Sequence, residues 1–451
     1  MTVPPPSSTF PAPGDGPVAI VGSGTAGCVV ARRLVDAGHD VLLLEAGPTD
    51  DPTPAVVRSL DHLRTGTLTD RWWAGLTAAR TSSSAPGPYP AGRGLGGTSM
   101  VNGLLAHVDR GDPALGARAE VDAAADRILL ETARARADEA GDLSAALVAA
   151  GSAESAMLAR RGDQRADVVS AYLQPVLDDP DRRRGLTVLG GVLVDRLRTT
   201  SDETSVVAAD GAVYRAAAVV LTAGALHTPA ILLRSHLGRR VGEHLQDHPS
   251  ISLHVSLRSR HHPTEVVTSS LVALDRVQLV PLDHLGDPRG LDAALLVALM
   301  RPNGAAGTVG LRSDDPNDTP DVRFRSYDDS SDLVAMRHGV RAALRLLETS
   351  PVAEIVASVS IDDSGTSPVS LADDDACDEW IRRSPGAHAH AAASCGIGRT
   401  LDGDGRVLGA PSVYVADAAA FPRVPRTGTH LPTIVQAERL VERWLRGRMY
   451  R

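Results

Sequence analysis

Three glycines near the N-terminus have the spacing of a dinucleotide-binding turn. Gly22, Gly24 and Gly27 form G-x-G-x-x-G before a helix that we expect over residues 26–37. The first glycine makes a tight turn, the second lets the backbone approach a pyrophosphate, and the third lets helix and strand pack closely. Free N–H groups at the helix N-terminus attract phosphate. The pattern predicts a dinucleotide site that also includes Thr25.

An acidic residue follows where a nucleotide ribose is usually recognised. Glu45 ends an apolar run, Val41–Leu44, and lies 18 residues after Gly27. A carboxylate there accepts hydrogen bonds from ribose hydroxyls and disfavours a 2′-phosphate. The residues therefore favour FAD or NAD over NADP, and by themselves they leave FAD and NAD open.

Two histidines lie in surroundings suited to proton transfer. His390 stands in a loop of small residues, and His430 precedes a helix with Pro432 in its first turn. Neutral imidazole can remove a hydroxyl proton because its ordinary pKa lies near working pH. His388 is a competitor that the sequence does not exclude. Other histidines stand in ordinary contexts and are expected to be structural, namely His39, His62, His254 and His338.

Composition and patterns exclude several other classes of function. The sequence has no H-E-x-x-H, C-x-x-C or G-x-S-x-G pattern, so we expect no metal centre and no serine hydrolase. Three cysteines without metal spacing indicate a reducing compartment. A net charge of −9 argues against nucleic-acid partners, and no apolar run approaches the ~20 residues of a membrane span. We expect a cytoplasmic protein with a disordered tail over 1–16.

The remaining chain must supply the elements that position these groups. The strand and helix patterns near 217–233 and 413–446 resemble those at the N-terminus, so the nucleotide domain is expected to be discontinuous. Strand patterns clustered over 265–330 predict a separate antiparallel sheet with one solvated face. Residues 115–160 are rich in Ala and predict structural helices.

Two further stretches near the N-terminus carry weaker signals. The glycine-rich segment 92–112 offers many N–H groups to an anion, and its apolar continuation indicates a packed loop. Trp72 and Trp73 are expected to pack under a long loop, with a ligand platform as the less favoured alternative.

Taken together, these blocks resemble the glucose–methanol–choline (GMC) family of FAD-dependent oxidoreductases. The resemblance extends from Val18 to about Trp444 and rests on VGSGTAGCVVARRL with Glu45, GRGLGGTSMVNG, GALHTPAILLRSHLG and the segment from His390 onward. The shorter segments VGEHLQDHP and GTVGLRSDDPNDTPDVRF agree as well. His236 replaces a usual Gly, and residues 391–394 depart from the family pattern.

The resemblance implies an α/β fold, in which a discontinuous Rossmann-type FAD-binding domain carries an inserted antiparallel-sheet substrate domain. Its expected parts are FAD-binding segments over 17–111, 166–249 and 385–451, a substrate domain over 250–384, and a helical lid or substrate segment over 112–165. This last segment replaces the aspartate–tryptophan region and lid that are usual in the family.

The resemblance also implies FAD as the cofactor and a role for each site residue. His390 would be the active-site base and His430 its partner, in hydride transfer from a small-molecule alcohol to flavin N5. Val101 stands where some members link FAD to histidine, so non-covalent FAD is expected. The residues implied to bind FAD are Gly22, Gly24, Thr25, Gly27, Glu45, Arg93, Gly97, Thr98, Asn102, Val194, Asp417, Ala418 and Pro432.

Several alternatives remain at this point. A non-redox lyase, a degenerate FAD-binding protein and an NAD-dependent dehydrogenase are rival functions on related folds. The chain's ending and compact size also suggest the mycofactocin-associated branch, which handles electrons from a peptide-derived redox cofactor. The sequence leaves the alcohol and the electron acceptor unknown.

Overall fold

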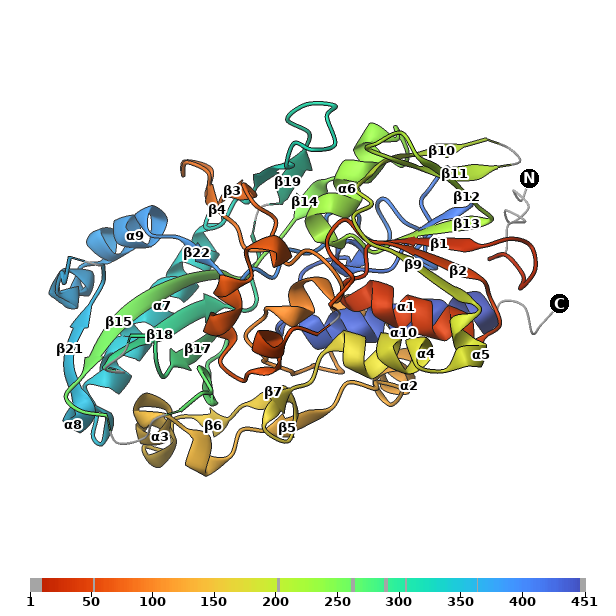
Figure 1. Cartoon of the computed structure of the whole chain (residues 1–451). Coiled ribbons are helices and arrows are strands. Elements are labelled where there is room, and N and C mark those ends of the chain that lie inside the picture. The colour runs from red at the N-terminus through yellow and green to blue at the C-terminus, as the bar shows by residue number, and fades with distance from the viewer. Residues whose placement is uncertain are drawn as a thin grey trace.

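The computed structural model describes residues 10–51, 53–200, 203–260, 264–287, 291–304, 306–362 and 364–446. Its nucleotide half is built on a five-stranded parallel sheet in the order β23-β13-β1-β2-β9 (Figure 1). The strands are β1 (Val18–Val21), β2 (Val41–Leu44), β9 (Leu186–Leu189), β13 (Ala218–Leu221) and β23 (Val413–Val415). Since these strands come from distant parts of the chain, the prediction of a discontinuous nucleotide domain is confirmed.

Layers on both sides cover the parallel sheet, as continuous apolar strands require. Val18 and Ile20 of β1 pack in one core with helices α1 (Thr25–Asp36) and α10 (His430–Arg446). Ala19 and Val21, the alternating residues, pack in a second core on the opposite face. That face carries α6 (Gly224–Arg234) and the antiparallel sheet β10 (Val194–Thr199), β11 (Thr204–Ala208) and β12 (Val213–Ala216).

Gly22 and Gly27 are required by close backbone contacts, of Gly22 with the segment after β13 and of Gly27 with the turn after β1. Gly22 has φ +99°, and a Cβ there would lie 2.7 Å from the carbonyl oxygen of Thr222. A Cβ on Gly27 would lie only 2.0 Å from the carbonyl oxygen of Gly22. Both positions therefore exclude side chains, as expected for the turn and packing roles of these glycines.

The second half of the molecule contains a larger sheet in the order β21-β15-β18-β17-β16-β6 (Figure 1). Its central strands are antiparallel, with Ile251 opposite Val297. One face packs against helix α7 (Ser330–Leu347). The strands are β6 (Glu154–Ser155), β15 (Pro249–Leu257), β16 (Ser270–Ala273), β17 (Val277–Leu282), β18 (Asp292–Leu299) and β21 (Val356–Ser360), and β22 (Gly386–Ala387) also pairs with β15.

The second face of this sheet is only partly open to solvent. His254 and Ser256 on it are half-buried, whereas Val280, Leu282 and Leu296, which alternate with residues of the α7-facing core, line a cavity. The sheet therefore forms one wall of the cavity. Two of the strands predicted over residues 265–330 belong instead to a different sheet, β14-β19-β20-β3-β4. Its strands are β3 (Thr77–Ala79), β4 (Gly87–Pro88), β14 (Glu243–Leu245), β19 (Gly307–Gly310) and β20 (Asp321–Arg323).

The Ala-rich segment is only partly helical, which corrects the prediction for 112–165. Helices α2 (Arg118–Ala125) and α3 (Asp142–Ala149) are present, but a three-stranded sheet lies between and after them. Its strands are β5 (Thr132–Arg134), β7 (Met157–Arg161) and β8 (Gln164–Arg165). Leu158 and Ala159 of β7 are buried, so packing overrides a weak helix propensity. The remaining helices are α4 (Gln174–Leu177), α5 (Pro180–Arg183), α8 (Val352–Ile355) and α9 (Asp374–Arg383).

The expected disordered tail over residues 1–16 is contradicted at Phe10. Residues 1–9 lie outside the described chain, but Phe10 is buried and stacks on Trp444 with ring centroids 5.0 Å apart. This contact anchors the chain against α10 before β1 begins. Within the described residues, no helix is both long enough and apolar enough to cross a membrane.

Candidate active site

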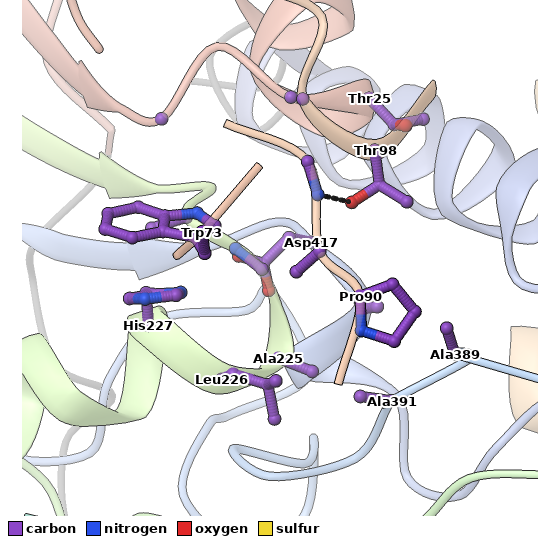
Figure 2. A pocket seen from close by; sticks show the side chains of 18 of the residues that line it. Thr25, Trp73, Pro90, Thr98, Ala225, Leu226, His227, Ala389, Ala391 and Asp417 are labelled. Atoms are coloured by element: carbon purple, nitrogen blue, oxygen red, sulfur yellow. Dashed lines mark hydrogen bonds between the residues drawn. The ribbon is translucent and has the colours of Figure 1, made fainter. Parts of the chain in front are cut away.

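A cavity of about 540 Å³ connects the nucleotide half with the antiparallel sheet. Loops at the carboxyl ends of β1 and β2 line part of it, where ligands bind in open parallel sheets. Figure 2 shows Trp73, His227, Thr98 and Asp417 around the cavity. The structure therefore joins the predicted nucleotide residues and the predicted histidines in one cavity.

Most of the sequence-predicted residues line this cavity, and three do not. Gly27 packs behind the turn, Arg93 lies over Trp73 at 5.3 Å, and Pro432 is buried in the first turn of α10. The predicted residues that line it are Gly22, Gly24, Thr25, Glu45, Gly97, Thr98, Asn102, Val194, Asp417, Ala418, His390 and His430.

The N-terminus of α1 provides hydrogen-bond donors to the cavity. Gly24 is its N-cap, no side chain caps the helix, and no acidic residue stands in its first turn. The first N–H groups of a helix lack intrahelical partners, and the helix dipole gives this end a partial positive charge. Gly24 and Thr25 line the cavity, so the helix end can bind an anionic group there.

Glu45 connects the loops that surround the nucleotide end of the cavity. Its Oε2 accepts hydrogen bonds from the N–H and hydroxyl of Ser23, at 2.9 and 2.7 Å. Its Oε1 accepts from the N–H groups of Gly47 and Gly94, at 2.8 and 2.9 Å. The carboxylate therefore holds three loops together, a role that its spacing from the glycines did not reveal.

Asp417 has a similar role at the start of α6. One oxygen accepts from the N–H of Gly224 and the hydroxyl of Thr228, at 2.7 and 2.6 Å, and the other accepts from Ala419 N–H at 2.8 Å. Burial raises the pKa of the carboxyl to about 6, although these hydrogen bonds favour the charged form. Asp417 therefore ties β23 to the first turn of α6 beside the cavity.

His390 is surrounded by three other histidines. Its Nδ1 lies 2.9 Å from Nδ1 of His248, and its ring stacks on His388 with centroids 4.9 Å apart and an interplanar angle of 2°. Burial, together with the charges of His388, His248 and His430, lowers the pKa of His390 well below its ordinary value. The ring is therefore neutral at pH 7, as a base requires.

His430 begins α10 and faces the same cavity. Neither of its ring nitrogens, both of them buried, has a hydrogen-bond partner among the described residues. Burial lowers its pKa to about 4. Unpaired buried imidazole nitrogens at a cavity wall are suited to bind a polar group of a ligand.

The segment Gln246–Asp247–His248 fixes the loops that carry these histidines. The N–H groups of His248 and His390 donate to Asp247 Oδ1 at 2.7 and 2.8 Å, and Tyr89 donates its hydroxyl to Oδ2 at 2.7 Å. Gln246 Oε1 accepts from Val424 N–H at 2.9 Å. In the sequence this segment appeared only as part of VGEHLQDHP. The run of polar residues immediately before a strand was the signal that could have identified it as part of the site.

Two tryptophans and a histidine lie at the cavity although the sequence favoured packing or structural roles for them. Trp72 and Trp73 both line the cavity, which favours the alternative of a ligand-facing pair. Trp73 stacks on His227 with ring centroids 4.0 Å apart (Figure 2). His62 was expected to be structural and also lines the cavity, and burial lowers its pKa to about 4.

Comparisons with known proteins agree with this architecture. Family models described as GMC oxidoreductase match residues 116–250 and 302–437, and one described as an NAD(P)-binding Rossmann-like domain matches residues 20–49. The chain is 28% identical over 500 aligned positions to a GMC-type oxidoreductase from Rhodococcus erythropolis, with 93% of this chain and 96% of the relative covered.

Two further proteins are similar over nearly the whole chain. The 5-(hydroxymethyl)furfural oxidase of Methylovorus sp. (strain MP688) is 28% identical over 522 aligned positions, with 94% of this chain and 97% of the relative covered. The crystal structure of pyridoxine 4-oxidase from Mesorbium loti has a TM-score of 0.81 at 20% identity. That alignment covers 95% of this chain and 99% of the other, and it confirms the fold.

Proposed function

The chain belongs to the GMC oxidoreductase family of FAD-dependent enzymes, and from that premise we propose that it oxidises a small uncharged alcohol, with His390 as the base. The observation that carries this proposal is the arrangement of the histidines. A neutral imidazole, His390, shares a cavity with the nucleotide-binding turn, and histidine partners surround it.

The residues of the cavity fit FAD. The uncapped N-terminus of α1 suits a pyrophosphate, and Gly22 and Gly27 leave no space for side chains behind it. One continuous cavity of about 540 Å³ extends from the nucleotide-binding turn to the histidines, which suits an extended dinucleotide. Val101 lines this cavity and has no nucleophilic atom, which supports non-covalent binding. We propose that the cavity-lining residues named above hold FAD, with Glu45 positioning the loops around its adenosine half.

The chain's own residues then prepare the alcohol for oxidation. When bound, the flavin supplies the acceptor for the hydride that leaves the substrate carbon. His390 takes the proton from the substrate hydroxyl, so that the C–O bond becomes a carbonyl as C–H and O–H break. His430 donates a hydrogen bond to the same oxygen and fixes its position. The first turn of α10 directs its positive dipole end toward the cavity, where it stabilises negative charge.

The charges along the cavity support an uncharged substrate. The cavity-lining carboxylates are Glu45, Asp417 and Asp318, and each is engaged in hydrogen bonds with the protein. Burial lowers the pKa values of His62 and His388 to about 4, so these rings are neutral at pH 7. Among the described residues that line the cavity, no carboxylate is free of protein hydrogen bonds, which disfavours a dedicated anionic partner for a substrate cation.

The visible spectrum of the purified protein is the test of this function. We expect bound flavin whose absorbance bleaches when a neutral primary alcohol is added without oxygen. Repeating the reaction in air then separates an oxidase from a dehydrogenase. Bound flavin that no alcohol bleaches would favour the lyase or peptide-cofactor alternatives, and a colourless protein that FAD cannot reconstitute would contradict the proposal.

Substrate charge gives a second, sharper prediction. We expect kcat/KM for choline to be lower by at least about 100-fold than for 3,3-dimethylbutan-1-ol, because an unpaired buried cation costs several kcal/mol. The two alcohols have nearly the same shape, so the comparison isolates the charge. Steady-state turnover of both at one pH measures it. Equal use of the two alcohols, or a preference for choline, would contradict the uncharged substrate class.

A further inference from the structure

His248 lies outside the cavity but controls one edge of the His390 ring. Its side chain is fully buried between two partners. Its Nδ1 lies 2.9 Å from Nδ1 of His390, and its Nε2 lies 2.8 Å from the carbonyl oxygen of Pro425. Since the rings meet at 86°, the contact is edge to edge and not a stack.

The carbonyl partner decides where the protons of this pair are. A carbonyl oxygen only accepts hydrogen bonds, so His248 must carry a proton on Nε2 and donate it to Pro425. Burial lowers the pKa of His248 to about 3, so the ring is neutral and carries one proton. Its Nδ1 therefore has a lone pair and accepts. Only His390 Nδ1–H can donate to it, which leaves Nε2 of His390 without a proton.

The remaining edge of His390 is then the basic one. The Cε1 and Nε2 atoms of His390 lie beside Gly428, and both residues line the cavity. A Cβ added to Gly428 would lie 3.4 and 3.5 Å from these atoms, so the missing side chain leaves this edge open. His388 covers the face of the ring and not this edge.

We infer that His248 is a positioning residue that holds His390 in the tautomer with a free Nε2 lone pair facing the substrate hydroxyl. The inference rests on the proposed function for its consequence, but the tautomer itself is a property of the protein. Asp247 supports the arrangement, because it binds the backbone N–H groups of both histidines. Two hydrogen bonds therefore act in series. The Pro425 carbonyl orients the His248 ring, and His248 in turn orients the His390 ring.

Two substitutions separate the tautomer from the packing. In His248→Asn, the side-chain oxygen lies near the former Nδ1 and can still accept from His390. In His248→Leu, similar volume remains but no acceptor is left. We expect His248→Leu to slow anaerobic flavin reduction about 10- to 100-fold, the size of effect that follows loss of the outer hydrogen-bond partner that fixes the tautomer of a metal-ligating histidine. We expect His248→Asn to recover most of that rate. Because His248 does not line the cavity, the substrate dissociation constant should stay within about twofold in both.

Nitrogen NMR of the unmodified holoenzyme tests the tautomer without any variant or substrate. With ¹⁵N-labelled histidine, and signals assigned through His390→Gln and His248→Asn, we expect His390 protonated on Nδ1 and His248 protonated on Nε2. His248→Leu should give a mixture of His390 tautomers. A His390 signal with the proton on Nε2 in the unmodified protein would overturn the inference, as would equal reduction rates in the Asn and Leu variants. Absence of alcohol oxidation, by contrast, would refute the proposed function and leave the NMR result standing.

Discussion

His390→Ala is expected to retain bound FAD and lose substrate-driven flavin reduction by about 10²–10⁴-fold, the usual contribution of a general base. The side chain faces the cavity and takes no part in the Glu45 or Asp417 contacts that hold the nucleotide loops. Its backbone N–H still donates to Asp247 in the variant, so the loop keeps its position. Anaerobic stopped-flow bleaching with a saturating alcohol measures the loss.

His388→Ala is the matched comparison for this experiment. Both rings line the cavity and lie parallel, but the hydrogen bond to His248 is made by His390. We therefore expect His388→Ala to change the reduction rate far less than His390→Ala. Unimpaired reduction in His390→Ala would refute its role as base. A larger loss in His388→Ala would assign that role to the neighbouring histidine.

Gly27→Ala is expected to have the largest effect on the fold and on cofactor content together. The new Cβ would lie 2.0 Å from the carbonyl oxygen of Gly22, and backbone cannot move as a flexible side chain would. Overpacking of this kind costs about 1–3 kcal/mol or more, and here it separates α1 from β1. We expect a lower Tm of the flavin-free protein and little flavin in the purified variant.

Gly24→Ala and Gly66→Ala separate the effect on the stability of the flavin-free protein from the effect on FAD binding. At Gly24 the nearest atom to an added Cβ is 3.9 Å away, but the residue lines the cavity. We expect this variant to keep the Tm of the flavin-free protein and to lose FAD affinity. Gly66 is exposed, with nothing within 4 Å of an added Cβ, and should change neither quantity. Because bound ligand raises Tm, all three are compared without flavin. A Gly27→Ala protein with normal Tm and normal flavin content would contradict the packing argument.

The sequence predicted the local parts of this protein well because their signals are short. Strand β2 spans the apolar run Val41–Leu44 seen in the sequence, and α1 begins one residue before the expected position. The spacing of Gly22, Gly24 and Gly27 reflects contacts within one strand–turn–helix unit, so it can be identified without any knowledge of the rest of the fold. The sequence also singled out His390 and His430, and the structure places both at one cavity. The resemblance that these blocks carry together identified the family, and the family implied FAD as the cofactor.

The tertiary structure decided the contacts between distant segments. His248 and His390 are 142 residues apart, and no local pattern shows that their nitrogens lie 2.9 Å from each other. The buried strand β7 overrode the helix propensity of its Ala-rich surroundings. The second face of the antiparallel sheet follows the alternation of a solvated face, yet part of it lines a cavity. Alternation shows which side of the sheet a residue faces, and it does not show what lies on that side. Chain folding alone therefore determined which side chains surround His390, the proposed base, and those contacts carry the inference about which of its nitrogens is protonated.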